Sequence, residues 1–458
     1  MKSYVKDMTV GKPTGLLLSF MLPMVIGNVF QQLYSMADSM IVGQFVGADA
    51  LAAVGATGSV NFLFFSLCSG MANGTGIVIS QHFGAGNSDY VKKAIANAAY
   101  IMLVAGLAMG GLGVLLAKPI LIFLNTPDNI LADATLYMRI VCAGVLATAA
   151  YNCISAILRA VGDSKTPLYF LIMSSILNVG LDIWFVRGLG MGVAGAAIAT
   201  IIAQFLSGVG SLMFAFAKNP FFKIERQQWK MDMEIIWQCT RMGVPLAFQT
   251  SLIAVSCVAL QSVVNTFGSV VVAAFTATSR FEQVVQQPYN SLGMAVSTYT
   301  GQNIGAGKID RVRQGYRKGL LIMAVFAMIM IPAAQFGGDF IMRLFVQDAE
   351  VIAFGSHALK ITSWFYLFLG SIYVTRGLLN GAGDAAFAFA NGLVEMLGRI
   401  CLAKPLTLIP SVGVWGVWLA TALTWMLAGL FNMSRYFQGK WKRRLRNQTS
   451  LFGLGFLF

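Results

Sequence analysis

Four acidic residues lie well inside long apolar stretches of the sequence: Asp38, Asp182, Glu282 and Glu395. A charged side chain near the centre of a bilayer costs about 2.5–3.5 kcal/mol on insertion scales, so each acid requires a partner or a function. Asp38 follows Gln31 by seven residues and Tyr34 by four. In a helix this spacing places the three side chains on one face. We therefore expect a polar stripe that faces protein or water, and the alternative role for Asp38 is a hydrogen bond to a neighbouring helix.

Asp182 lies four residues after Asn178, one helical turn away on the same face. Asn152 lies in the preceding apolar stretch and Thr200 in the following one. With Asp38, these residues offer two carboxylates, two amide oxygens and a hydroxyl, which are oxygen ligands of the kind that hard cations take. A carboxylate buried beside another carboxylate also binds a proton more readily. The cluster is therefore predicted to bind Na⁺ or H⁺, whereas hydrogen bonding between helices is the alternative role for Asn178.

A second polar segment, TSRFEQVVQQPYNS at 278–291, lies within one predicted span. It holds five residues that we expect to line a water-filled cavity: Arg280, Glu282, Gln283, Gln286 and Gln287. Arg280 and Glu282 are two residues apart and do not face each other on a helix, which favours a cavity lining over an ion pair. Glu395 and Arg399 are four residues apart, in the favoured order for a pair, and are predicted to neutralise each other.

The elements that must position these residues are membrane-spanning helices. Of the 458 residues, 57% are hydrophobic and 11% are charged, whereas soluble domains carry about 25% charged residues. Because a span needs about 20 apolar residues, we predict an all-α polytopic membrane protein with twelve transmembrane helices, near 15–40, 50–79, 94–117, 134–160, 167–186, 193–217, 234–264, 270–299, 316–343, 354–380, 387–408 and 413–437. Pro23 removes a backbone donor and is predicted to bend the first helix.

The sequence contains a duplication. Gln81 begins the sequence QHFGAG, and Gln302 begins the matching QNIGAG in the second half of the chain. The same offset in residue number separates three further pairs of matching residues: Thr57 and Thr278, Asp163 and Asp384, Thr200 and Thr421. We therefore predict two pseudo-symmetric six-helix bundles around a central cavity, related as parallel repeats. The predicted parts are an N-terminal lobe at 1–217, a cytoplasmic linker at 218–233, a C-terminal lobe at 234–438 and a basic cytoplasmic tail at 439–458.

The acidic cluster is not part of this duplication. At the offset that relates the two halves, Asp182 corresponds to Ala403, and Asn178 corresponds to Arg399. A structural role shared by both halves would require carboxylates in both halves. The difference therefore favours a functional role for the cluster in the first half.

Lysine and arginine residues concentrate in the loops on one side of the predicted spans, and the net charge is +14. The positive-inside rule then places both termini and both Gly-Ala-Gly loops in the cytoplasm. The basic sequence GKWKRRLR at 439–446 is expected to contact anionic lipid rather than nucleic acid. The six cysteines lie in apolar stretches and only two histidines occur, which argues against a zinc site or a disulfide framework. The sequence shows no motif for ATP hydrolysis or hydrolase chemistry, and we therefore do not expect an enzyme.

The twelve spans, the two halves, the segment LYSMADSMIVGQFVG and the paired Q-x-x-G-A-G loops resemble the MATE (multidrug and toxic compound extrusion) family, and most closely its DinF-like branch. The resemblance implies an essential Asp on a Pro-bent first helix, at Asp38 and Pro23. It implies roles in cation coupling or the surrounding cavity for a further set of matching residues: Asn178, Asp182, Thr200, Gln31, Tyr34 and Asn152. The NorM-like branch uses acids on the seventh and tenth helices, and this chain has none in GVPLAFQTSLIAVS or TSWFYLFLGSIYVTRG.

This resemblance implies an antiporter of the bacterial inner membrane that works by alternating access. It would export amphipathic, often cationic, drugs or metabolites in exchange for H⁺ or Na⁺, without another cofactor. We expect small-molecule substrates and membrane lipid as partners, no nucleic acid, and a monomer. The alternative is a flippase or exporter of a lipid-linked or polar metabolite in the same superfamily. A membrane-embedded lipid transferase and a channel are the other classes considered.

Overall fold

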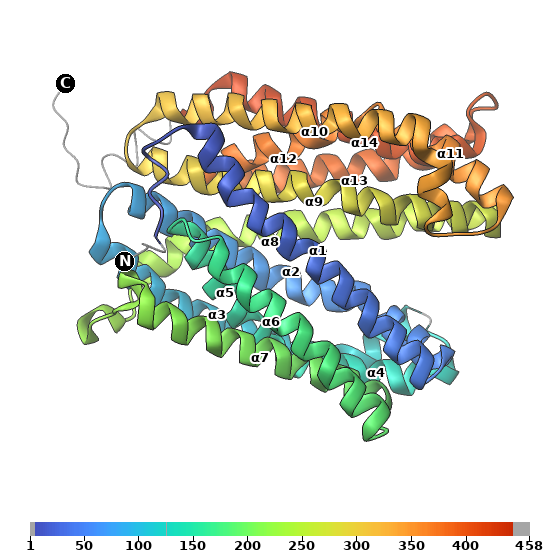
Figure 1. Cartoon of the computed structure of the whole chain (residues 1–458), viewed down its shortest axis with the longest axis horizontal. Helices are drawn as coiled ribbons and strands as arrows, with labels where there is room; N and C mark the ends of the chain where they lie inside the picture. Colours follow the sequence, from blue (N-terminus) through green and yellow to red (C-terminus); the bar gives the residue numbers. More distant parts are fainter. Residues whose placement is uncertain (1–4, 125, 443–458) are drawn as a thin grey trace. The chain divides into compact units, whose positions relative to one another are not determined.

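The computed structural model describes residues 5–124 and 126–442, and Figure 1 shows their arrangement. The described chain divides into two compact units. Unit 1 comprises residues 5–7 and Leu22–Phe248, and unit 2 comprises Met8–Met21 and the chain from Gln249 onward. The divisions fall inside two helices, α1 (Pro13–Phe45) and α8 (Met233–Val264). Of the predicted tail, residues 443–458 lie outside the described residues.

Long helices make up both units. Besides parts of α1 and α8, unit 1 contains α2 (Ala48–Gly84), α3 (Ser88–Phe123), α4 (Asp128–Ala143), α5 (Val145–Ala160), α6 (Lys165–Asp182), a π-helical turn η1 (Ile183–Gly188), α7 (Gly192–Lys218), and the short 3-10 turns η2 (Pro220–Phe222) and η3 (Arg226–Trp229). Unit 2 contains η4 (Asn265–Phe267), α9 (Ser269–Gly305), α10 (Ile309–Arg343), α11 (Ala349–Ser363), α12 (Tyr366–Gly381), α13 (Ala385–Leu408), η5 (Gly413–Trp415) and α14 (Gly416–Gln438).

Every predicted span lies on one or two of these helices, so the all-α membrane fold is confirmed. Among the described residues, nine helices are long and apolar enough to cross a membrane. A tenth span arises if α4 and α5, which are bent by 46° relative to each other, count as one. The remaining two predicted spans correspond to α9, which carries the polar segment, and to the successive helices α11 and α12.

The turns between helices repeat at the predicted offset. Four pairs of glycines with positive φ are separated by the same offset as Gln81 and Gln302: Gly47 and Gly268, Gly86 and Gly307, Gly162 and Gly383, Gly192 and Gly413. At the paired Gly-Ala-Gly loops, Gly86 has φ 73° and Gly307 has φ 70°. Because a side chain strains this left-handed conformation, glycine ends each helix there. The shared geometry confirms the duplication in the backbone.

A cluster of apolar side chains holds together the helices that carry the acidic residues in unit 1. Ile41 and Val42 of α1 pack in one buried cluster with Tyr137 of α4, Val186 of η1 and Val193 of α7. In a lipid environment such packing, rather than release of water, drives helix association. The later part of α1 is therefore fixed beside α4, η1 and α7.

In unit 2, the segment Met8–Gly11 is bound to the end of α9 and the start of α10. Gln302 accepts a hydrogen bond from the Met8 backbone N–H at 2.8 Å, and the Asn303 amide donates to the Met8 carbonyl at 3.1 Å. Arg311 Nη2 donates to the Gly11 carbonyl at 2.9 Å. The glutamine and asparagine of the QNIGAG loop thus anchor a segment from the other end of the chain.

Candidate functional site

Three elements of unit 1 bring the predicted cation-binding residues together. Asp38 lies on α1, Asn178 and Asp182 lie on α6 immediately before the π-helical turn η1, and Thr200 lies on α7. Asp182 is 0% exposed and Asn178 is 2% exposed. The carboxyl groups of Asp38 and Asp182 interact electrostatically. The two acids, although far apart in the sequence, therefore form one site.

Several oxygen atoms at this site have no hydrogen-bond donor among the described residues. They are one carboxylate oxygen of Asp38, both carboxylate oxygens of Asp182 and the amide oxygen of Asn178. A buried polar atom without a partner costs about 1–3 kcal/mol, and more where it carries charge. Because all four atoms are acceptors, a proton or a cation would satisfy them. The residues present therefore fit the predicted coupling ion, H⁺ or Na⁺.

Asn178 is oriented by Thr200. The Asn178 amide nitrogen donates to the Thr200 hydroxyl at 3.3 Å, and that hydroxyl donates to the Ala196 carbonyl at 3.1 Å. This arrangement leaves the amide oxygen of Asn178 without a donor. The hydrogen bond between α6 and α7 that we gave as the alternative role of Asn178 is thus present, and it also positions an acceptor at the site.

The other predicted site residues of unit 1 divide into two groups. Tyr34 interacts with the Gln31 side chain and lies within electrostatic reach of Asp38 and Asp182. Asn152 instead donates to the Thr148 carbonyl on its own helix at 2.8 Å. Gln31 and Tyr34 therefore belong to the site, whereas the described contacts of Asn152 lie within α5.

Tyr137 of α4 is a site residue that is missing from the sequence prediction. It lies within electrostatic reach of Asp38, Asp182 and Tyr34, and it is 9% exposed. Tyrosine counts as apolar in a search for interior charges, and no other residue of α4 drew attention to it. A search for hydroxyl groups inside predicted spans would have found it.

The polar segment on α9 belongs to unit 2 and has mixed surroundings. Glu282 is buried, whereas Arg280 is exposed. The two side chains therefore differ in environment, as their spacing predicts. Gln286 accepts a hydrogen bond from the Tyr373 hydroxyl of α12 at 2.9 Å. Gln283 is exposed and Gln287 is half-buried.

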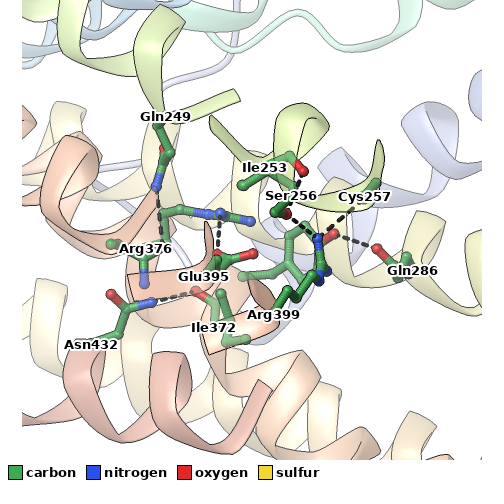
Figure 2. Close-up of polar contacts among 12 residues, drawn as sticks. Gln249, Ile253, Ser256, Cys257, Gln286, Ile372, Arg376, Glu395, Arg399 and Asn432 are labelled. Atoms are coloured by element: carbon green, nitrogen blue, oxygen red, sulfur yellow. Dashed lines mark hydrogen bonds and ion pairs between the residues drawn. The ribbon is translucent and has the colours of Figure 1, made fainter. Parts of the chain in front are cut away.

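The predicted ion pair between Glu395 and Arg399 is wrong. Glu395 pairs with Arg376 of α12, with 3.3 Å between Oε1 and Nη1. Arg399 donates to the Ser256 hydroxyl at 2.8 Å and to the Cys257 sulfur at 3.1 Å, both on α8 (Figure 2). A partner from a packed neighbouring helix has displaced the partner one turn away on the same helix, and the sequence spacing could not reveal that packing.

Comparisons with known proteins agree over nearly the whole chain. The MatE family model matches residues 23–184 and 245–403. The chain is 30% identical to "Probable multidrug resistance protein YpnP" of Bacillus subtilis (strain 168), covering 96% of this chain and 98% of that protein. It is 25% identical to the "FAD transporter" of Shewanella oneidensis, covering 90% and 92%.

Solved structures show the same fold. One is described as "Outward-facing conformation of a multidrug resistance MATE family transporter of the MOP superfamily". It has a TM-score of 0.89 and 21% identity, and the match covers 98% of each chain. The family match and the relative that is 30% identical show that the chain belongs to the MatE family and is a membrane transporter rather than an enzyme.

Proposed function

We propose that this transporter exports amphipathic, often cationic, drugs or metabolites across the bacterial inner membrane in exchange for H⁺ or Na⁺. The observation that carries the proposal is the group of acceptor oxygens without donors on Asp38, Asn178 and Asp182. The resemblance to the DinF-like branch and the similarity to a probable multidrug resistance protein support the same function.

In the proposed cycle, the coupling ion binds between Asp38 and Asp182 and cancels their mutual repulsion. Asn178 contributes its amide oxygen, held in place by Thr200. A cationic substrate then loses the negative charge that attracts it and is released. One charge moving across 100 mV supplies about 2.3 kcal/mol, and a tenfold ion gradient adds about 1.4 kcal/mol.

Helix α1 is the proposed link between ion binding and alternating access. It carries Asp38 in unit 1, its first residues belong to unit 2, and Pro23 lies beside the division at Met21 and Leu22. A proline inside a helix removes one backbone hydrogen bond and permits a bend. We propose that the ion changes this bend while the lobes at 1–217 and 234–438 rock.

The remaining assignments extend this proposal. Polar side chains of two groups are proposed to contact substrate along its path: Gln31, Tyr34 and Asn152 in unit 1, and Arg280, Glu282, Gln283, Gln286 and Gln287 in unit 2. Both termini are assigned to the cytoplasm, the tail at 439–458 to anionic lipid, and the protein to a monomer. The similarity to an FAD transporter supports the second candidate, an exporter of polar metabolites.

The test is efflux of ethidium from cells that express the wild type, Asp38→Asn or Asp182→Asn at matched levels. Asp133→Asn is the control, because Asp133 is an exposed carboxylate on α4 of the same unit. We expect the wild type and the control to lower dye accumulation and both site variants to fail. A proton uncoupler and removal of Na⁺ identify the ion. Normal export by Asp38→Asn contradicts this coupling site, and a wild type that moves no dye favours the polar-metabolite exporter.

A further inference from the structure

Unit 2 contains a polar cluster, largely buried apart from Cys257, that the proposed coupling site does not use. It joins α8, α12 and α13, and its central residues are Ser256, Cys257, Arg376, Asn391, Glu395 and Arg399. Asn391, Glu395 and Arg399 are spaced four residues apart on α13 and therefore share one face of that helix. The three residues are 1%, 5% and 8% exposed, respectively. Figure 2 shows Glu395 and Arg399 directed toward Arg376 and α8.

The Arg399 guanidinium of this cluster forms no ion pair among the described residues. Arg376 and Glu395 form an ion pair with each other. The hydrogen bonds of Arg399 go to a hydroxyl and a thiol, both of which are neutral. Glu282 lies within electrostatic reach of Arg399, and its Oε1 atom has no hydrogen-bond partner among the described residues, but the two side chains form no ion pair there. An anion in direct contact with the guanidinium would further stabilise its buried charge.

Two nitrogen donors on the same face of α13 lack acceptors among the described residues. They are Nε of Arg399 and the amide nitrogen of Asn391. The Asn391 amide oxygen already accepts a hydrogen bond from Gln249 at 3.2 Å, which fixes the direction of the amide. The Ser256 hydroxyl donates to the Ile253 carbonyl at 2.6 Å, so its proton is not available to Arg399 or to a ligand. The site therefore offers donors to a ligand that accepts.

We propose that Arg399 binds the carboxylate of an amphipathic organic anion. A guanidinium presents its N–H groups in a planar fork that matches a carboxylate. Cys257 contacts the guanidinium and is exposed, so it marks the side from which a ligand would approach the buried Arg399. Its role in substrate choice rests on the proposed export function, but binding at Arg399 is measured without transport.

Cys257 provides a reporter for this binding. Among the described cysteines, Cys257 and Cys401 are exposed and the other four are buried. The experiment uses the full-length Cys401→Ser protein in phosphatidylcholine nanodiscs and follows alkylation of Cys257 by N-ethylmaleimide. The probe is benzoate, and benzamide is its neutral control of similar shape. We expect benzoate to slow alkylation in a saturable manner and benzamide to have no effect.

Substitutions of Arg399 and Glu282 test whether the charge at this site causes the protection of Cys257 by benzoate. Arg399→Gln should lose protection by benzoate, and Arg399→Lys should keep part of it, which also shows that an altered protein at this position still folds. Glu282→Gln removes a competing negative charge and should give protection at lower benzoate concentration. Equal protection by benzoate and benzamide, protection that survives in Arg399→Gln, or a Cys257 that fails to react overturns the carboxylate site.

A comparison of nanodiscs with and without anionic lipid distinguishes binding of a small carboxylate from binding of a lipid headgroup. If discs containing phosphatidylglycerol slow alkylation without benzoate, and benzoate then adds nothing, the site belongs to lipid and the proposal is overturned. The Asp38 and Asp182 variants are independent of this experiment. Failure of the coupling site would leave benzoate protection intact, and failure of benzoate protection would leave ion-coupled export intact.

Discussion

The two units of this transporter share a backbone plan and differ in the chemistry inside their spans. The Gly-Ala-Gly turns are the same to the level of single hydrogen bonds. The Asn87 backbone N–H donates to the His82 carbonyl at 3.0 Å in unit 1, and the Lys308 backbone N–H donates to the Asn303 carbonyl at 2.8 Å in unit 2. Donor and acceptor occupy matching positions of the repeat in the two units. The duplication has therefore preserved the turns that set helix direction.

Inside the spans, one matched position shows the difference. Asn178 of unit 1 corresponds to Arg399 of unit 2. Around Asn178, the atoms without partners are acceptor oxygens, whereas on the Arg399 face of α13 they are nitrogen donors. A site that lacks donors favours a cation or a proton, and a site that lacks acceptors favours an anion. The two proposals together assign ligands of opposite charge to one scaffold, whose turns constrain the helices and leave interior side chains free to diverge.

Near the loops, the matching residues Asp163 and Asp384 also differ in their binding partners. Asp163 of unit 1 accepts a hydrogen bond from the Thr166 hydroxyl at 2.6 Å, and burial raises the pKa of this aspartate above its usual value although the bond opposes the shift. The matching Asp384 of unit 2 pairs instead with Arg435, at 2.7 Å between Oδ2 and Nε. Phe387 stands at the position that matches Thr166. Loss of the threonine is therefore matched by an arginine from α14.

The largest effect is expected when Asn178 of unit 1 is replaced by arginine, the residue type at the matching position 399 of unit 2. Asn178→Arg places a guanidinium beside Asp182, where it would occupy the carboxylate and repel a cation. We expect loss of ion-coupled ethidium export, measured as dye accumulation at matched expression. Asn178→Gln keeps an amide at this position and should retain part of the export. Export by Asn178→Arg at the wild-type level would show that the charge difference between the units has no functional meaning.

The two aspartates near the loops predict a smaller difference, in stability. Arg435→Ala leaves a buried carboxylate without its ion-pair partner and should lower the free energy of unfolding by about 3 kcal/mol. Thr166→Val removes a hydrogen bond to a charged group and should cost about 1.5 kcal/mol. Thermal unfolding of the purified proteins in detergent gives the order, with Arg435→Lys as the charge-preserving control. If Thr166→Val lowered the stability more than Arg435→Ala, the contact in unit 1 would be the stronger of the two, which contradicts this prediction.

The smallest expected effect sharpens the comparison at the paired threonines. Thr200→Val removes the hydroxyl that positions Asn178, at a cost of about 1 kcal/mol, which corresponds to about a fivefold weaker binding of the coupling ion. Thr421 is the matching residue of unit 2, and its hydroxyl donates to the Val417 carbonyl within α14. Thr421→Val is therefore the matched control. The measurement is export rate against ion concentration, and equal shifts in both variants would count against a specific role for Thr200.

The sequence predicted the helices well because their apolar runs are long. It missed the division of one predicted span into α4 and α5 at Gly144, because both halves are apolar and a bend leaves no gap in the pattern. Spacing along one helix and matches between adjacent spans indicated Asn178, Asp182 and Thr200. Such spacing could not indicate Tyr137 or the partner of Glu395, since both depend on which helices pack together.

The anchoring of Met8 affects how the chain is completed during synthesis. Met8–Met21 are synthesised before the rest of unit 2, which begins at Gln249, yet Met8 binds Gln302, 294 residues later. Unit 2 therefore combines a segment made before most of unit 1 with a loop made after it. Such distant contacts form late in folding. A protein split between Phe248 and Gln249 would cut α8 and leave Met8–Met21 on the first fragment, so the second fragment would lack this segment of unit 2.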